Sequence, residues 1–485
     1  MNEDLLKLKP EGFWRNFRSL TLIPRPSKHE TAAVNFLLDF AKHKSIEAFK
    51  DQAGNVIMRK PASKGMEHIT GIILQAHIDM VPQKTADKVH DFEKDPITTV
   101  IKDGYVWADN TTLGADDGAG VAAIMSVFED NSLVHGPLEA LITVDEETGM
   151  TGAQGLQPGI LKGKIMLNLD SEAENIFFIG CAGGVNAETT MPMNFVPINV
   201  NDYQAYIIKL SGYRGGHSGD DIIKNRPNAI KLLFRFIYDN QNIGFKTGKF
   251  SGGSLRNAIP REAQAELYVE KSKMHEFETA VARYGEIYFS EYGKSDPDSK
   301  FEFEKVDGDA KVLDDSSFKN ALFLINALPS GVFSMCADID ALVETSNNLA
   351  IVNCCVDKLE THSLIRSSVM SQQEYLKNLF KNICDFAGAE LTFSGEYPGW
   401  KPNPDSAILK IAAQCNKRVM NVEPVARAIH AGLECGLISG KYPDLDMISM
   451  GPDMIAIHTP EERINIDSAA RFMNLLIEIL RSVNV

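Results

Sequence analysis

Three apolar runs in the first part of the chain each end in side chains that can bind a metal or carry a proton. Residues 68–79 read HITGIILQAHID, residues 138–149 read LEALITVDEETG, and residues 163–172 read GKIMLNLDSE. Short apolar runs of this kind are typical of central strands in a parallel sheet. Helical patterns lie between them, which favours an α/β fold with helices on both faces of the sheet. Such a sheet should gather the side chains that follow its strands at one edge, and here these are His77, Asp79, Glu146, Glu147 and Asp170.

The alternating pattern is interrupted in the middle of the chain. It changes near residue 187, becomes a mixture of strands and helices from about 205 to 395, and resumes after Gly395. A chain of 485 residues is also too long for a single core. We therefore expect a catalytic domain of residues 1–186 and 396–485 with a mostly parallel sheet. An inserted α+β lid domain should span residues 187–395 as two lobes of related wiring.

Composition narrows the function classes. The formal net charge of -16 argues against a nucleic-acid groove or an anionic membrane surface. The seven cysteines form no CxxC pair, which indicates reduced thiols rather than a disulfide scaffold. The N-terminus has no apolar signal segment, and no run approaches the roughly 20 apolar residues of a membrane span. These features predict a soluble cytoplasmic protein.

Two further segments carry candidate ligands. Asp116 and Asp117 lie in GADDGAG, a glycine-framed turn before an apolar helix. Capping of the helix N-terminus would explain one aspartate, but two adjacent carboxylates between glycines are harder to explain in this way. His458 follows a predicted strand in IAIHTPEER. Taken alone, such a histidine is typical of an ordinary hydrogen-bonded side chain.

In this order, the motifs AHIDM, GADDGAG, DEETG, NLD and IHTPEE resemble those of the co-catalytic metallopeptidases that include carnosinases, peptidase T and aminoacyl-histidine dipeptidase. IPRPSKHE and TTLGADDGAG are similar to the peptidase T and aminoacyl-histidine dipeptidase branches. The large insert and HAGLECG (430–436) resemble the latter branch in particular. The chain departs from the pattern at Asn110, where a glycine is expected, and this change should affect only the shape of a loop.

The resemblance implies a pair of metal ions that share one carboxylate. The first ion would bind His77, Asp116 and Asp170, and the second would bind Asp116, Glu147 and His458. Nitrogen and oxygen ligands without a thiolate suit zinc, and manganese or cobalt are also acceptable. Two such cations lower the pKa of a shared water and polarise the scissile carbonyl.

The same resemblance assigns the catalytic and substrate-binding residues. Asp79 would orient the His77 ring, Glu146 would be the general base, and His217 of YRGGHSG would stabilise the tetrahedral oxyanion. Asn257 and Arg366 would bind the substrate carbonyl and the terminal carboxylate.

The expected reaction is hydrolysis of the amide bond of dipeptides, particularly Xaa-His peptides such as carnosine. Three alternatives stay open: a tripeptide aminopeptidase, a deacylase of N-acyl amino acids, and a catalytically inactive peptide-binding scaffold. The oligomeric state is a further open point, and a homodimer is one possibility. Since the insert reads as two lobes, a second lobe could replace a partner's, and His217 would then act on the metals of its own chain.

Overall fold

The computed structural model describes residues 1–355 and 357–483, and these residues fold into two compact units. The first unit contains residues 1–181, 400–428 and 433–485, and the second contains residues 182–399 and 429–432. The domain boundaries expected from the sequence stay predictions, and Asn484 and Val485 lie outside the described residues. After the chain has re-entered the first unit, residues 429–432 belong to the second unit again. No sequence pattern indicated this.

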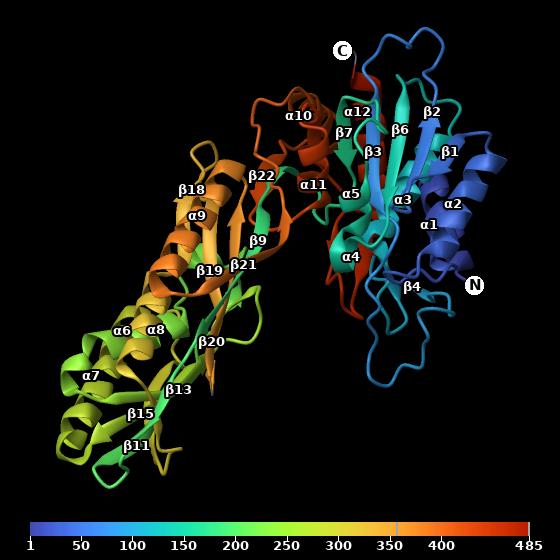
Figure 1. The fold of residues 1–485 in the computed structure, drawn as a ribbon. Coiled ribbons are helices and arrows are strands. Elements are labelled where there is room, and N and C mark those ends of the chain that lie inside the picture. Colours follow the sequence, from blue (N-terminus) through green and yellow to red (C-terminus); the bar gives the residue numbers. More distant parts are fainter. Residues whose placement is uncertain (356, 484–485) are drawn as a thin grey trace. The chain divides into compact units, whose positions relative to one another are not determined.

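The first unit is built on an eight-stranded sheet whose centre is parallel (Figure 1). The strands, in spatial order, are β1 (Glu47–Lys50), β2 (Val56–Lys60), β6 (Leu138–Thr143), β3 (Ile72–His77), β7 (Ile165–Asn168), β23 (Asp446–Ser449), β8 (Ile176–Cys181) and β22 (Val425–Ile429). Pairing is parallel from β6 through β23 and antiparallel where β1, β2 and β8 join. The predicted α/β sheet is thus confirmed, with antiparallel strands added on both sides of its centre.

Helices cover both faces of this sheet. As a result, every residue of the central strands β3 and β6 is buried. The helices of the first unit are α1 (Glu11–Thr21), α2 (Thr31–His43), α3 (Ala115–Glu129), α4 (Glu146–Gly149), α5 (Thr151–Gly155), α10 (Ala407–Met420), α11 (Glu434–Lys441) and α12 (Ile466–Ser482). A second, small sheet contains β24 (Met454–Ile455), β25 (Arg463–Asn465), β5 (Tyr105–Ala108) and β4 (Thr99–Lys102). Among the described residues, no helix combines the length and apolar character that crossing a membrane requires.

The second unit is built on a nine-stranded sheet to which two lobes with the same wiring contribute (Figure 1). The first lobe runs through β11 (Tyr203–Ser211), α6 (Ala229–Asp239), β13 (Lys246–Gly252), β15 (Ala263–Glu270), α7 (Met274–Tyr292) and β16 (Lys300–Val306). The second runs through β9 (Gly183–Pro192), α8 (Asp315–Ala327), β19 (Val343–Cys355), β20 (Lys358–Ser367), α9 (Met370–Ala387) and β21 (Glu390–Tyr397).

The two lobes correspond element by element. Their spatial orders, β13-β15-β11-β16 and β19-β20-β9-β21, match when each strand is paired with its counterpart. They join where β13 pairs antiparallel with β19, and the short strand β18 (Gly331–Met335) also pairs with β19. Aromatic residues of α6, α7 and α9 pack with the strands in one continuous core. This architecture confirms the predicted α+β insert of two related lobes.

Candidate functional site

Five segments of the first unit meet at the carboxyl end of its parallel strands. His77 is the last residue of β3, Glu146 and Glu147 begin α4 after β6, and Asp170 follows β7. The turn that opens α3 supplies Asp116, and the segment after β24 supplies His458. The sequence placed the strand-end residues at one edge, and the structure brings all six side chains together there.

Asp116 lies between the two histidines. Its Oδ1 is 3.1 Å from His77 Nε2 and its Oδ2 is 3.2 Å from His458 Nε2. Around it, one group of ligand atoms comes from His77, Asp116 and Asp170, and another from Asp116, Glu147 and His458, with all atoms of a group within 4.8 Å of one another. One carboxylate therefore offers a different oxygen to each of two donor groups, an arrangement that suits a metal-bridging ligand.

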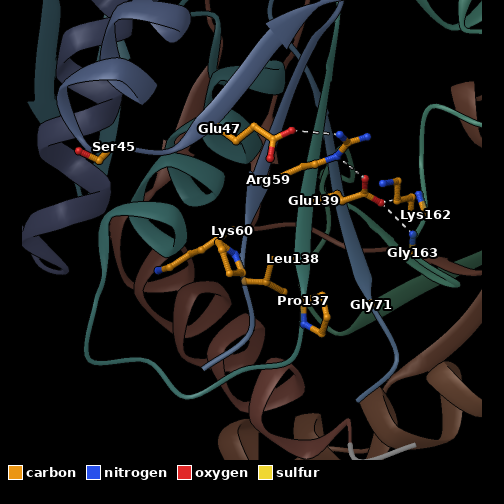
Figure 2. Close-up of a pocket in the computed structure, with 11 residues that line it drawn as sticks. Ser45, Glu47, Arg59, Lys60, Gly71, Pro137, Leu138, Glu139, Lys162 and Gly163 are labelled. Atoms are coloured by element: carbon orange, nitrogen blue, oxygen red, sulfur yellow. Dashed lines mark hydrogen bonds and ion pairs between the residues drawn. The ribbon is translucent and has the colours of Figure 1, made fainter. Parts of the chain in front are cut away.

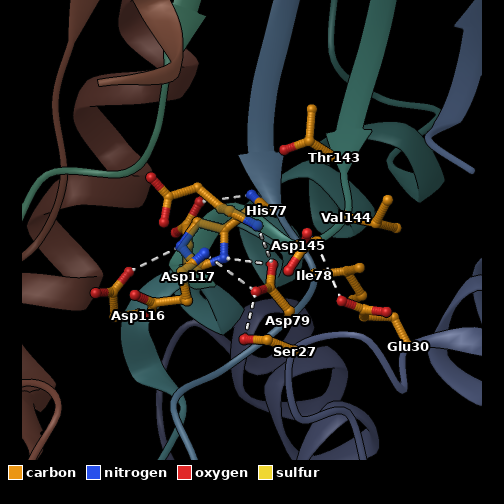
Figure 3. Close-up of polar contacts among 12 residues, drawn as sticks. Ser27, Glu30, His77, Ile78, Asp79, Asp116, Asp117, Thr143, Val144 and Asp145 are labelled. Atoms are coloured by element: carbon orange, nitrogen blue, oxygen red, sulfur yellow. Dashed lines mark hydrogen bonds and ion pairs between the residues drawn. The ribbon is translucent and has the colours of Figure 1, made fainter. Parts of the chain in front are cut away.

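The neighbouring Asp117, labelled in Figure 3, has different hydrogen-bond partners. This fully buried carboxylate accepts hydrogen bonds from the backbone N–H of Gly120 at 2.9 Å and of His77 at 3.3 Å. Burial, together with Asp170, raises its pKa well above the usual value. Asp117 thus serves the start of α3, as a capping residue would, and Asp116 faces the histidines.

Asp79 lies beside the ring of the first histidine (Figure 3). Its Oδ1 is 3.3 Å from His77 Nδ1, so that His77 Nε2 points to Asp116 and Asp170. Ser27 Oγ and the backbone N–H groups of Glu146 and Glu147 donate to the same carboxylate. Although burial acts to raise it, the bonds from His77 and these donors lower the pKa of Asp79 to about 2.

Charge at this edge is strongly unbalanced. Asp79, Asp116, Glu146, Glu147 and Asp170 are gathered around two imidazoles. Burial raises the pKa of Glu146 to about 8, with Glu434 and Glu147 adding to the effect and His77 opposing it. Hydrogen bonds that its ring donates to Asp116 and Glu147 raise the pKa of His458 to about 10. Buried carboxylates at this density need compensating cations, and the donor set fits divalent metal ions.

The candidate substrate residues lie in the second unit. His217, on the short strand β12 (Gly216–His217), pairs with Ala258 of β14 (Ala258–Ile259), next to Asn257. The backbone N–H groups of Gly219 and Asp220 donate to His217 Nδ1, both at 3.3 Å, which leaves the ring proton on Nε2. Burial and the nearby Arg366 guanidinium lower the pKa of His217. The ring therefore offers an N–H donor at Nε2.

Arg366 is the central cation of this cluster. It lies on β20, is 5% exposed, and its Nη1 is 3.3 Å from Tyr397 Oη. Among the described residues, no carboxylate lies within ion-pair distance of it. Asn257 is exposed, and its backbone carbonyl accepts a hydrogen bond from the N–H of Ser218 at 2.8 Å.

Sequence reasoning missed His430 in this cluster. The residue belongs to the HAGLECG motif and lies in the segment that returns to the second unit. Its Nε2 is 2.7 Å from Ser346 Oγ, and burial beside Arg366 and His217 lowers its pKa to about 3. The HAGLECG motif indicated the family, but only the three-dimensional structure could show that His430 contacts Ser346.

A separate cavity of about 560 Å³ in the first unit has no such chemistry. Its lining includes Gly71 and Leu138, at the start of β3 and β6, so it lies at the opposite edge of the sheet from His77. Its charged groups bind one another: Arg59 bonds to Glu47 and Glu139, and Glu139 accepts from the Lys162 and Gly163 N–H groups (Figure 2). The constellation around Asp116 is therefore the better candidate for the active site.

Comparison with known proteins agrees with this geometry. The family described as peptidase family M20/M25/M40 matches residues 73–482. The chain belongs to this family. The resemblance inferred from five ordered motifs is thus confirmed, as is the prediction of a metallopeptidase.

Two relatives match almost the whole chain. The cytosol non-specific dipeptidase of Escherichia coli (strain K12) is 38% identical over 481 residues, which cover 99% of each protein. The solved aminoacylhistidine dipeptidase of Vibrio alginolyticus is 39% identical, with a TM-score of 0.95 over 99% of this chain and 98% of that one. Aminopeptidase PepT of Bacillus cereus, 18% identical with a TM-score of 0.58 over 99% of this chain and 100% of that one, shares the fold.

Proposed function

We propose that this protein is a dipeptidase that depends on two divalent cations. One observation carries the proposal: Asp116 offers one oxygen to the group with His77 and Asp170, and the other to the group with Glu147 and His458. Imidazole nitrogen and carboxylate oxygen without a thiolate suit zinc, and also manganese or cobalt. When bound, the cations would polarise the scissile carbonyl and acidify the attacking water.

The residues of the chain would then move the protons. Glu146 accepts a proton from the water as its oxygen attacks the carbonyl carbon, and returns it to the leaving amine as the C–N bond breaks. A buried carboxylate beside the two donor groups can take up this proton and pass it to the amine. Asp79 keeps His77 in one ring orientation throughout.

The substrate would be held by the cluster of the second unit. The neutral His217 would donate its Nε2–H to the oxyanion, and Arg366 would bind the terminal carboxylate of the peptide. Asn257 would contact the substrate carbonyl through its exposed amide. A buried guanidinium without a carboxylate partner is costly, and a peptide carboxylate would supply the missing charge.

The names of the two full-length relatives suggest the substrate class. One is named a non-specific dipeptidase and the other an aminoacylhistidine dipeptidase. We infer that this chain cleaves dipeptides, Xaa-His peptides of the carnosine type among them, in the cytoplasm. A homodimer is compatible with this function.

A substrate panel tests the proposal. The metal-depleted protein, reloaded with Zn²⁺ or Mn²⁺, would be assayed with alanyl-histidine, β-alanyl-histidine, dialanine, trialanine and N-acetylalanine. We expect kcat/KM to be highest for the dipeptides and activity to vanish with a chelator. The amide of alanyl-histidine is the matched control, because it lacks the carboxylate assigned to Arg366, and its KM should rise.

The other outcomes would identify the alternatives. Preference for trialanine would indicate a tripeptide aminopeptidase, and preference for N-acetylalanine a deacylase. Metal binding without hydrolysis of any of these compounds would indicate an inactive peptide-binding protein.

A further inference from the structure

The turn that presents Asp116 is bound along its backbone by the carboxylate of Glu462. This side chain is 2% exposed and accepts hydrogen bonds from four consecutive N–H groups. Its Oε2 accepts from Leu113 at 2.7 Å and Gly114 at 3.0 Å, and its Oε1 from Ala115 at 2.7 Å and Asp116 at 3.3 Å. A carboxylate with both oxygens engaged in this way fixes the path of the turn.

Arg25 binds the same turn through its carbonyl side. The guanidinium is 1% exposed, and its Nη2 donates to the Gly114 carbonyl at 2.6 Å. Its Nη1 donates to the carbonyls of Ile78 and Asp79 at 2.7 and 3.0 Å. Arg25 therefore ties the turn of Asp116 to the segment that directly follows His77.

Glycines make room for this arrangement. Gly114 has a φ of +68°, and a Cβ placed there would lie 2.6 Å from Arg25 Nη2. A Cβ on Gly118 would lie 2.7 Å from the same nitrogen. The glycines that frame the aspartate pair thus admit a buried arginine, as well as allowing the turn itself.

Position in the chain gives the two side chains their significance. Glu462 lies four residues after His458, and Arg25 contacts the backbone of Asp79, two residues after His77. Through the turn, the two charges join the segments that carry His77, Asp116 and His458. Stability alone does not explain why an arginine and a glutamate are buried here. Burying charges costs free energy, and apolar residues at such positions often give a folded state that is at least as stable.

We propose that Arg25 and Glu462 are positioning residues that clamp the turn at 113–116 and so hold Asp116 between His77 and His458. This proposal rests on the proposed function in one respect: it takes Asp116 to be the ligand that the two metal ions share. Groups that orient metal ligands without touching the ion commonly change metal affinity by about 10- to 100-fold when replaced.

The test compares Glu462→Gln with Glu461→Gln. An amide has one acceptor oxygen, so it cannot accept from all four N–H groups, and it carries no charge opposite Arg25. We expect Glu462→Gln to weaken Zn²⁺ binding by the metal-depleted protein about 10- to 100-fold, measured by chelator competition. The visible spectrum of the Co²⁺-loaded protein should also change. Glu461 is exposed, and its variant should match the wild type in both measurements.

Two results would overturn the proposal. The first is Glu462→Gln with a lower melting temperature but unchanged Zn²⁺ affinity and Co²⁺ spectrum, which would make the pair purely structural. The second is the same shift in Glu461→Gln. Should Glu462→Gln fail to fold, the same measurements on Arg25→Lys decide, since lysine cannot bind all three carbonyls in the guanidinium geometry. Dipeptide hydrolysis by the wild type, assayed in parallel, separates failure of this proposal from failure of the proposed function.

Discussion

The two units contain clusters with opposite electrostatic needs. In the first unit, five carboxylates crowd around His77 and His458, so negative charge is in excess. In the second, a buried Arg366 lies near two histidines of lowered pKa and lacks an anion among the described residues. Each cluster is costly as a set of side chains and becomes favourable with a ligand of the missing charge. The contrast separates the candidate metal ligands from the residues proposed to bind an anionic group of the substrate.

The largest expected effect comes from removing the shared carboxylate of the first cluster. Asp116→Ala should lose both metal ions and all measurable turnover, because it deletes a ligand of each donor group. Metal content by elemental analysis and kcat would be measured together. Asp117→Asn is the matched control: it replaces a carboxyl of raised pKa that bonds to backbone N–H groups, and it should keep two ions. Two retained ions in Asp116→Ala would show that another residue bridges them.

The second prediction separates metal binding from proton transfer. Glu146→Gln should retain both ions while kcat falls by about 10²–10⁴-fold, the usual cost of losing a general base. Because the ligands remain, the Co²⁺ spectrum should resemble that of the wild type. Loss of metal together with activity would make Glu146 a ligand rather than the base.

The third prediction moves to the second cluster. His217→Ala should lower kcat by about 10²–10³-fold with unchanged metal content, since an oxyanion donor is lost. Asp220→Asn is the control, because Asp220 is exposed and 3.6 Å from His217 Nδ1 rather than at the donating Nε2. Mixing His217→Ala chains with Glu146→Gln chains tests which chain the histidine serves. We expect no recovery, and recovered activity would show that His217 acts on a partner.

The smallest effect concerns stability and pH. The folded pKa of His430, about 3, lies below its ordinary value of 6.5, so the unfolded chain binds the proton more tightly. The contribution of neutral, buried His430 to the free energy of unfolding is therefore fully present above pH 6.5, and it is lost as the pH falls towards 3. At pH 4 this amounts to up to about 3 kcal/mol. His430→Gln should therefore lose less stability than the wild type between pH 7 and pH 4, as urea unfolding would measure. Equal losses would mean that His430 is not buried in neutral form.

Much of the candidate site followed from local sequence. His77, Glu146, Glu147 and Asp170 directly follow or end apolar runs, and such runs pair as parallel strands whose carboxyl ends meet at one edge. The two related lobes were likewise visible in the order of predicted strands and helices. Both predictions use information within short segments, because the spacing of apolar residues shows which face of a strand or helix is buried.

Tertiary structure decided what depends on contacts between distant segments. The family resemblance selected Asp116, but the letters of GADDGAG alone do not tell which aspartate faces the histidines. In the structure the turn is hydrogen-bonded by Glu462 and Arg25, and Asp116 faces the histidines while Asp117 bonds to the helix. His430 entered the second cluster only because its segment returns to that unit. Sequence patterns record which face of an element is buried. The partner of a buried charge is decided only when distant segments fold together. The candidate ligands could therefore be proposed from the sequence, whereas the contacts of Arg25 and Glu462 could not.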